Sequence, residues 1–191
     1  MPASPKRCPW SLSGNELYIH YHDTEWGVPV WNEQKQFEFL ILEGAQAGLS
    51  WSTILNKREG YRKAFAKFDI EKVARFGKRD VTRLMNDESI VRNRLKIESA
   101  ITNARALLDF KDQHGDFVNY LWSFVDGKPI VNKRKVHGDV PATTPESDKL
   151  SKDLKKHGFK FVGSTIIYAH MQATGMVNDH LTSCFRYRQC R

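Results

Sequence analysis

Residues 155–175 read KKHGFKFVGSTIIYAHMQATG, and this stretch contains two possible turns followed by a helical pattern. Gly158 can end one helix in a left-handed conformation, and Gly163 lets the backbone turn again. The residues that follow resume helical spacing, with Ile167 and Met171 on the inward face. The stretch therefore predicts two helices joined by a short hairpin.

The start of the second helix is a candidate phosphate site. Free backbone N–H groups and the positive end of the helix dipole both favour an anion there. Nearby lysines add charge that positions DNA without reading its sequence. An ordinary helix–helix turn with a left-handed glycine explains the same spacing without any ligand. The candidate phosphate-binding residues are Lys160, Gly163, Ser164 and Thr165.

Helical periodicity recurs along the rest of the chain, and no segment shows the sustained alternation that is typical of strands. The fold is therefore expected to be all-α. The longest pattern covers residues 90–111, with Leu95 on its apolar face. Residues 126–143 are basic, rich in turn formers and expected to be mobile. The other expected helices are 33–48 after an Asn32 cap, 70–76 after Asp69, 81–85 after Asp80, 117–124, and one that opens at Thr144-Pro145.

The composition is that of an ordinary globular protein. The 191 residues are 40% hydrophobic and 12% aromatic, enough for one core or two small helical lobes within a single functional unit, 1–191. Neither a signal peptide nor a run of about 20 apolar residues is present, so a cytoplasmic protein without membrane contact is expected. An excess of 30 Lys and Arg over 22 Asp and Glu gives a net charge of +8, which favours polyanionic partners, nucleic acid above all.

The three cysteines are an odd number, which argues against a disulfide framework and directs attention to metal ligands. His180 and Cys184 are four positions apart, a spacing that puts two ligands on one face of a helix. Cys8 and His22, with His20 as an alternative, supply the same pair of types near the other end of the chain. Together they predict a closed two-Cys, two-His zinc site. The alternative is that these residues are only buried core groups.

Cys190 is left out of this site, because it lies beyond the predicted pairing and near a chain end that is expected to fray.

Five blocks of the sequence occur in a recognisable order: YHDTEWGVP (21–29), LEGAQAGLSW (42–51), RNRLKIESAITNAR (92–105), GFKFVGST (158–165) and VNDH (177–180). Taken together they resemble the type I 3-methyladenine DNA glycosylases, which are bacterial base-excision repair enzymes. The resemblance covers nearly the whole chain and implies a helix-hairpin-helix fold with one structural zinc ion that fastens the termini. It places the zinc ligands at Cys8, His22, His180 and Cys184, and the base pocket at Trp10, Tyr21, Glu43 and Trp51.

The chemistry of these pocket residues suits an extruded, alkylated adenine. Such a base is held by stacking and by hydrogen bonds to its edge, and methylation at N3 makes the ring cationic, which attracts it to aromatic faces. Trp51 offers a face and Tyr21 a hydroxyl. The Glu43 carboxylate can accept the exocyclic amine of adenine but opposes the carbonyl of guanine. The alternatives are core packing for the aromatic residues and an ion pair or solvent exposure for Glu43.

The catalytic machinery implied by the resemblance is reduced. Many helix-hairpin-helix glycosylases have an aspartate in a Val-Asp-x-His setting, where this chain has Asn178. Bifunctional members have a lysine where this chain has Thr165, so no Schiff base and no strand cleavage are expected. A neutral base leaves a cationic precursor without a general acid, so Glu43 is expected to bind and polarise. Asp179 either positions water or orients His180.

The sequence thus predicts a monomeric, monofunctional glycosylase that acts on double-stranded alkylated DNA with the damaged base flipped out. It would release free 3-methyladenine and leave an abasic site. One alternative is a non-catalytic, zinc-stabilised helix-hairpin-helix module that binds DNA. A second alternative is a hydrolase that uses the zinc ion as its catalyst.

Overall fold

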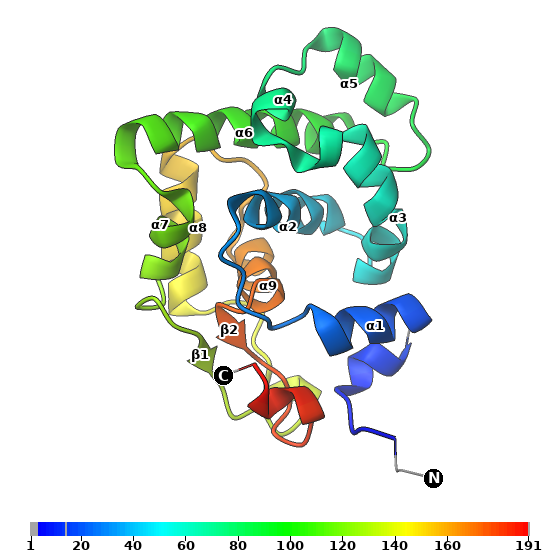
Figure 1. The fold of residues 1–191 in the computed structure, drawn as a ribbon, viewed down its shortest axis with the longest axis vertical. Coiled ribbons are helices and arrows are strands. Elements are labelled where there is room, and N and C mark those ends of the chain that lie inside the picture. Colours follow the sequence, from blue (N-terminus) through cyan, green and yellow to red (C-terminus); the bar gives the residue numbers. More distant parts are fainter. Residues whose placement is uncertain (1–3, 14, 191) are drawn as a thin grey trace.

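A computed structural model of the chain describes residues 4–13 and 15–190. It is built of helices stacked around α2, as Figure 1 shows, with a short parallel strand pair beside the C-terminal segment. In chain order the elements are a 3₁₀ turn (Pro9–Ser13), α1 (Glu16–Thr24), α2 (Glu33–Gln46), α3 (Trp51–Ala64), a 3₁₀ turn (Ala66–Phe68), α4 (Ile70–Ala74), α5 (Lys78–Met85), α6 (Arg94–His114), α7 (Phe117–Ser123), β1 (Ile130–Val131), a 3₁₀ turn (His137–Asp139), α8 (Pro145–Lys156), α9 (Ser164–Ala173), β2 (Val177–Asn178) and a 3₁₀ turn (Phe185–Arg188).

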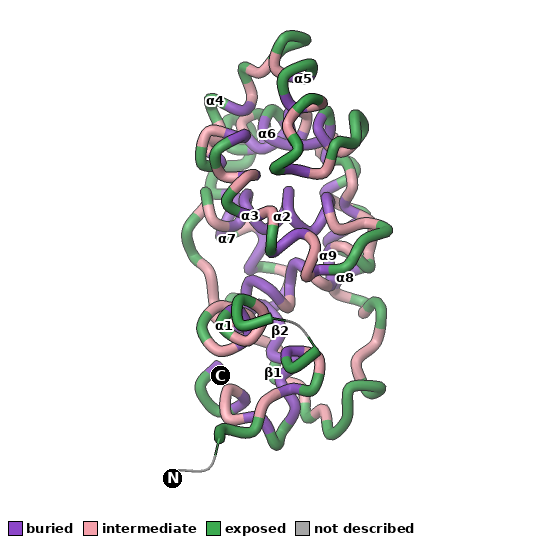
Figure 2. The backbone as a smooth tube through the Cα atoms, turned by 90° about the vertical axis from the view of Figure 1, so that its right-hand side faces the viewer, coloured by how far each residue is buried: buried purple, intermediate pink, exposed green. Residues whose placement is uncertain are grey.

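Helix α2 is the centre of the core. All its residues from position 36 to position 45 are buried, and it packs against α3, α6, α7 and α9. Figure 2 shows buried backbone concentrated around α2 and α9. A helix that is enclosed on every side must be apolar nearly all round. The exceptions in this buried run are the amide of Gln36 and two carboxyl groups, those of Glu38 and Glu43.

The two carboxyl groups of α2 have different surroundings. Glu38 lies 2.8 Å from Nε of Arg58, 2.9 Å from Nε of Arg62 and 3.2 Å from Nζ of Lys35. These cations lower the pKa of Glu38 against the opposing effect of burial, which is the largest single influence. Glu43 has no ion pair with a described residue. Of the two buried carboxyl groups, only Glu38 is therefore neutralised by cations of the fold.

The all-α prediction is confirmed, because the strand pair β1–β2 has two residues on each side. The caps at Asn32, Asp69 and Thr144 are also confirmed, since each side chain accepts a hydrogen bond from a backbone N–H three residues later. The cap at Asp80 is wrong. Helix α5 begins earlier, after Gly77, and the Asp80 carboxylate accepts the Gly77 N–H from inside the first turn.

The long helix is shorter at its start than periodicity predicted. Asn93 caps α6, so residues 90–93 precede the helix. Leu95, which was expected on the apolar face, is 66% exposed. It lies in the first turn of the helix, where the chain has just left the core. The inward stripe begins with Ile97.

The predicted hairpin between α8 and α9 is present, with one change in its turn. Gly158 is left-handed as expected, with φ of +85°, but Gly163 has φ of −60° and caps α9, while Phe161 takes the second left-handed position. Asn103 of α6 fixes the hairpin through both backbone groups of Lys160, at 2.7 and 2.9 Å. The turn also packs on α2, because a Cβ at Gly44 would lie 3.3 Å from that of Phe161.

The segment 126–143 contains β1 and a 3₁₀ turn, and β1 pairs with β2 in parallel register, Ile130 with Val177. Among the described residues, no helix is both long and apolar enough to cross a lipid bilayer.

His170 on α9 provides a test of the buried core. It is 1% exposed, and neither ring nitrogen has a hydrogen-bond partner among the described residues. Burial lowers the pKa of His170 from 6.5 to about 3. Between these values the unfolded chain binds more protons than the folded one, so stability is full above pH 6.5 and falls as the pH drops.

We expect His170→Leu to remove this part of the acid sensitivity. Its free energy of unfolding should fall less steeply below pH 6.5 than that of the unaltered protein, by up to about 1.4 kcal/mol per pH unit. Denaturant unfolding at about pH 5 and about pH 7 measures the difference. Both proteins carry the same candidate metal-ligating side chains, so any pH dependence that these side chains cause is the same in both and cancels in the comparison. Parallel pH dependences would contradict the prediction.

Candidate functional site

Four side chains from opposite ends of the chain meet in one buried cluster. The ligand atoms of Cys8, His22, His180 and Cys184 all lie within 4.8 Å of one another. Cys184 Sγ is 3.4 Å from His22 Nε2 and 3.6 Å from His180 Nδ1, and Cys8 Sγ is 3.7 Å from His180 Nδ1. A tetrahedron with arms of about 2.0–2.3 Å has edges of about 3.3–3.8 Å, so the cluster has the size of a metal site.

The far side of each imidazole ring fits this role. His22 Nδ1 lies 2.7 Å from Oδ1 of Asp23, and His180 Nε2 lies 3.0 Å from the backbone oxygen of Trp26. Each outer nitrogen thus donates its proton to an oxygen, which leaves a lone pair on the inner nitrogen of each ring. The inner nitrogen of His22 also accepts the Cys8 backbone N–H at 3.4 Å. The four residues present fit a soft or borderline divalent metal ion.

The thiols of the cluster differ in their readiness to ionise. The pKa of Cys184 is lowered, first by the hydrogen bond from the Cys8 thiol, against the effect of burial. The Leu181 N–H lies 3.4 Å from Cys8 Sγ and supplies a further donor. The local groups therefore favour the ligating, deprotonated form at Cys184, whereas the hydrogen bond to Cys184 and burial raise the pKa of Cys8.

One part of the spacing argument is wrong. His180 and Cys184 do not share a helix, since β2 ends at Asn178 and a turn follows, closed by the bond from the Cys184 N–H to the Leu181 oxygen. The alternative ligand His20 is exposed and lies outside the cluster. Cys190 is buried, at 1% exposure, and its backbone oxygen accepts a bond from Asn178, so this position is not frayed.

Close packing around the cluster requires a glycine. Gly27 has φ of +78°, and a Cβ at this position would lie 3.0 Å from His180 Nε2. A larger residue would press on the ring whose other nitrogen faces the sulfur atoms. The backbone also joins the two ends of the chain, through the bond from the Phe185 N–H to the Lys6 oxygen.

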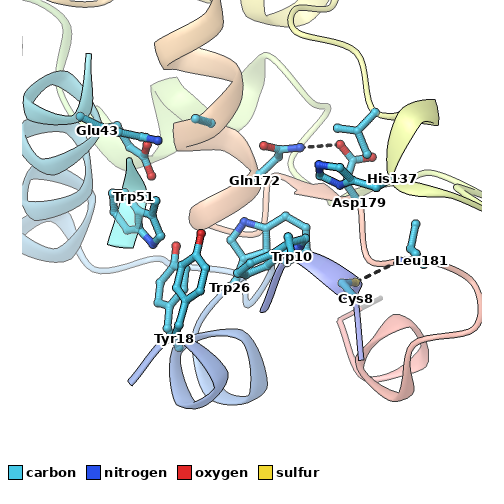
Figure 3. Close-up of a pocket in the computed structure, with 14 residues that line it drawn as sticks. Cys8, Trp10, Tyr18, Trp26, Glu43, Trp51, His137, Gln172, Asp179 and Leu181 are labelled. Carbon is cyan, nitrogen blue, oxygen red and sulfur yellow. Dashed lines mark hydrogen bonds between the residues drawn. The ribbon is translucent and has the colours of Figure 1, made fainter. Parts of the chain in front are cut away.

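A cavity of about 310 Å³ lies beside the cluster. The four residues singled out as a pocket, Trp10, Tyr21, Glu43 and Trp51, all line it. Figure 3 shows Trp51 and Glu43 at one end and Asp179 with His137 at the other. Sequence reasoning did not find the further lining residues Tyr18, Trp26, Gln46, His137 and Gln172. Tyr18 alone had a usable signal, since it precedes Tyr21 by one helical turn.

The aromatic residues form a wall of two groups of contacting rings. The rings of Tyr21 and Trp51 are 5.4 Å apart and tilted, and Trp10 meets Tyr18 at 5.2 Å and Trp26 at 5.0 Å, edge to face. Trp51 Nε1 has no hydrogen-bond partner among the described residues. Aromatic faces with an unused donor suit a flat, polar-edged and electron-poor ligand.

Glu43 is a buried acid at this end of the cavity, and it has no neutralising partner among the described residues. It is 4% exposed, and no described residue donates a hydrogen bond to it. Desolvation raises its pKa from 4.5 to about 8, so the empty cavity holds it largely protonated at neutral pH. A cationic ligand would lower this pKa and so favour the deprotonated carboxylate.

The metal cluster and the cavity share their supporting elements. Tyr21 and His22 are neighbours on α1, and they contribute to the cavity and the cluster respectively. Cys8 belongs to both, and Trp10 follows it by two residues with its ring 5.3 Å from that of His22. A metal ion bound here would therefore hold the aromatic wall against the rest of the fold.

Asp179 lines the cavity but is fully engaged. Its carboxylate accepts hydrogen bonds from Asn132, Arg134, Tyr168 and Gln172. None of these contacts is with His180, whose outer nitrogen meets Trp26 instead. Both roles considered for Asp179 are thus at odds with its contacts, and it ties residues 132–134 to α9.

The hairpin residues lie apart from this cavity. Lys160 and Thr165 are exposed, and Ser164 exchanges a hydrogen bond of 2.8 Å with Ser147 at the start of α8. Ser164 lines a separate surface hollow together with Lys152, Lys155 and Lys156. The geometry leaves this surface basic and open to an anion, and the phosphate contacts remain a prediction.

Comparison with known proteins gives one consistent answer. A family model described as methyladenine glycosylase matches residues 10–187. The chain is similar to DNA-3-methyladenine glycosylase 1 of Escherichia coli K12, at 51% identity over 95% of this chain and 97% of the relative. It is also similar to the DNA-3-methyladenine glycosylase of Haemophilus influenzae, at 47% identity over 93% and 96% of the two chains.

Solved structures agree with these relatives. A crystal structure of 3-methyladenine DNA glycosylase I has a TM-score of 0.92 at 50% identity and covers 94% of this chain and 98% of its own. A structure described as the basis of 3-methyladenine recognition by the Staphylococcus aureus enzyme has a TM-score of 0.88 at 38% identity, with 90% and 91% covered. A further neighbour is a variant in complex with 3-methyladenine, with a TM-score of 0.87 at 38% identity and 90% and 92% covered.

Removing one ligand should empty the metal cluster. We expect Cys184→Ala to lose a bound metal ion and to lower the free energy of unfolding by roughly 3 kcal/mol or more, because metal binding and folding are coupled. Elemental analysis and denaturant unfolding measure the two effects. His20→Ala, an exposed histidine outside the cluster, is the control. Equal metal content in the two variants would contradict the assignment.

Glu43 should cost the empty protein stability at neutral pH. Because its pKa rises from 4.5 to about 8 on folding, the folded state binds more protons than the unfolded state in that window, and stability is lost as the pH rises through it. We expect Glu43→Gln to gain stability relative to the unaltered protein between pH 4.5 and about 8, by up to about 1.4 kcal/mol per unit. Denaturant unfolding across this pH range measures the difference, with the exposed Glu59→Gln as the control. Equal stability of Glu43→Gln and the unaltered protein would contradict the prediction.

Proposed function

This chain belongs to the methyladenine glycosylase family, and on that premise we propose that it hydrolyses the N-glycosidic bond of 3-methyladenine in alkylated DNA. The products are free 3-methyladenine and an abasic site. The relatives and structural neighbours are named for this activity, and one neighbour holds 3-methyladenine.

The observation that carries the proposal is the unpaired, buried carboxyl group of Glu43 at the end of an aromatic cavity. Burying such a group is costly unless a ligand compensates it. A nucleotide methylated at N3 carries a positive charge on its base, so it attracts both the carboxylate and the indole and phenol faces. Ordinary adenine lacks this charge and gains less from the same cavity. The cavity thereby binds the methylated base in preference to ordinary adenine.

The same carboxyl group supports a preference for adenine. In its ionised form Glu43 only accepts hydrogen bonds, so it suits the exocyclic amine of adenine and opposes the carbonyl oxygen of guanine. Its pKa of about 8 in the empty cavity means that the incoming cation must draw out the charged form. Base binding at neutral pH should therefore release a proton from Glu43 to solvent.

Little further catalytic machinery is needed for this substrate. The methylated base leaves as a neutral molecule, so Glu43 has to bind and polarise the ring, not protonate it. Asp179 is occupied by four donors and Thr165 stands where a Schiff-base lysine would be required. We therefore assign Glu43 the catalytic role and propose a monofunctional enzyme.

We propose that the buried cluster holds one zinc ion, because two thiolates and two imidazoles in a tetrahedral set are typical of structural zinc. The ion supplies a cross-link between the two ends of the chain. With four protein ligands it offers no open coordination position to a substrate, which argues against a hydrolase that uses this metal as its catalyst.

We further propose that residues 1–191 act as one unit and as a monomer on double-stranded DNA. The reacting base must leave the duplex to enter the cavity, and the hairpin residues Lys160, Gly163, Ser164 and Thr165 would bind the backbone. A chromosomal substrate places the enzyme in the bacterial cytoplasm.

Base release from methylated DNA tests the function directly. We expect the protein to liberate 3-methyladenine from DNA treated with a methylating agent and to leave 7-methylguanine in place, as measured by chromatography of the free bases. Tight DNA binding with no base released would instead indicate the non-catalytic DNA-binding module.

The pH dependence tests the role of Glu43. Because kcat/KM reports the ionisation of the free enzyme, we expect it to rise with pH until about 8 and then level off. Glu43→Gln should lose this rise and lower kcat/KM roughly 10- to 100-fold, the value of one hydrogen bond to a charged group. The exposed Glu59→Gln is the matched control. A profile shared by all three proteins would exclude the proposed role.

A further inference from the structure

The basic strap, residues 132–140 with the sequence NKRKVHGDV, runs beside the cavity and has a built attachment to the core. Asn132 Nδ2 and Arg134 Nε donate to Oδ1 of Asp179 at 2.8 and 3.0 Å. The Thr182 N–H donates to the Arg134 backbone oxygen at 2.8 Å. The strap is thus held at the segment that leads into the metal cluster.

The tip of the strap has its own internal support. The carboxylate of Asp139 accepts the backbone N–H groups of Lys135 and Val136 at 2.9 and 3.1 Å. His137 and Val140 line the same cavity as Glu43. Figure 3 shows His137 next to Asp179 and Gln172, away from Glu43. The strap therefore forms one side of the cavity at the end opposite the buried acid.

Two lysines of the strap have no ion-pair partner. Lys133 and Lys135 are exposed and form no ion pair with a described residue, whereas Arg134 pairs with Asp179. The Asp139 carboxylate offsets part of the positive charge, because it interacts electrostatically with Arg134 and Lys135. With three basic residues against this one acid, the strap carries a net positive charge on a segment whose tip lines the cavity.

Helix α9 relates the strap to the hairpin. Its ten residues span about 15 Å. The hairpin precedes its first residue, whereas Asp179, the anchor of the strap, follows its last residue by six positions. Ala169 and Gln172 of the same helix line the cavity between them. Figure 1 shows β2 at the opposite end of α9 from its hairpin end. A DNA strand rises about 3.4 Å per nucleotide, so 15 Å corresponds to about four nucleotides.

We propose that Lys133 and Lys135 bind the DNA backbone on the side of the extruded nucleotide opposite the hairpin. The inference rests on the proposed function, because a substrate that runs across the cavity needs a contact at each end of α9. The lysines neutralise phosphates and so hold the flanking strand without reading its bases. The strap thus supplies a second contact to the DNA backbone. The buried Asp179 carboxylate beside the cavity holds the strap in place through Asn132 and Arg134, and it takes no part in the reaction.

The salt dependence of DNA binding tests the strap. The probe is a duplex that carries a tetrahydrofuran abasic-site analogue, titrated with protein at several salt concentrations. For Lys133→Ala/Lys135→Ala we expect weaker binding and a log–log salt slope that is smaller in magnitude by about 1 for each lysine. Lys133→Arg/Lys135→Arg keeps the charges and should restore the slope of the unaltered protein.

The matched control removes the same charge elsewhere. Lys78→Ala/Arg79→Ala alters two exposed residues of α5, which Figure 1 places at the far end of the molecule from β1 and β2. This variant should retain the slope. If the strap and control variants share one slope, the strap is not a DNA contact. Absence of base release by the unaltered protein would overturn the glycosylase proposal separately, because the slope is measured without catalysis.

Discussion

The ligand selectivity of the cavity follows from an uncompensated carboxyl group at the centre of the fold. Helix α2 is buried on all sides, and it carries Glu38, which three cations neutralise, and Glu43, which none does. Burial raises the pKa of Glu43, which faces an aromatic cavity. Its desolvation is an energetic cost in the empty protein that a cationic ligand relieves. Selectivity for a charged, damaged base follows from this one constraint.

Two supports keep the cavity in shape around that group. The cluster of Cys8, His22, His180 and Cys184 joins both ends of the chain, and Trp10 and Tyr21 are attached to it through sequence neighbours. Helix α9 supplies the opposite wall and connects the hairpin to the segment that holds Asp179. A small all-α protein can thus hold a cavity open, because the four-residue Cys and His cluster and α9 support its walls from different sides.

Much of the fold and of the candidate site is determined locally. Helical periodicity and side-chain caps such as Asn32 and Thr144 act within a few residues, and Gly158 marks the hairpin because only its backbone freedom is needed there. Ligand chemistry is also a property of residue type, so the four Cys and His residues could be selected from the sequence. Glu43 was selected through the resemblance to the glycosylases, because its local sequence alone equally allowed an ion pair, as found at Glu38, or solvent exposure.

Tertiary structure decided what depends on distant neighbours. His180 and Cys184 reach the Cys and His cluster from a turn and not from a helix. Their spacing of four residues did not determine the local structure, because contacts with the remote Cys8 and His22 also fix their positions. The Asp179 carboxylate is occupied by hydrogen-bond donors from residues 132–134 and from α9, so it takes no part in the reaction. None of these donors is adjacent to it in sequence. The protonation of Glu43 likewise depends on what surrounds it. Sequence fixes residue types and local periodicity, whereas burial and charge pairing arise only when remote segments pack together.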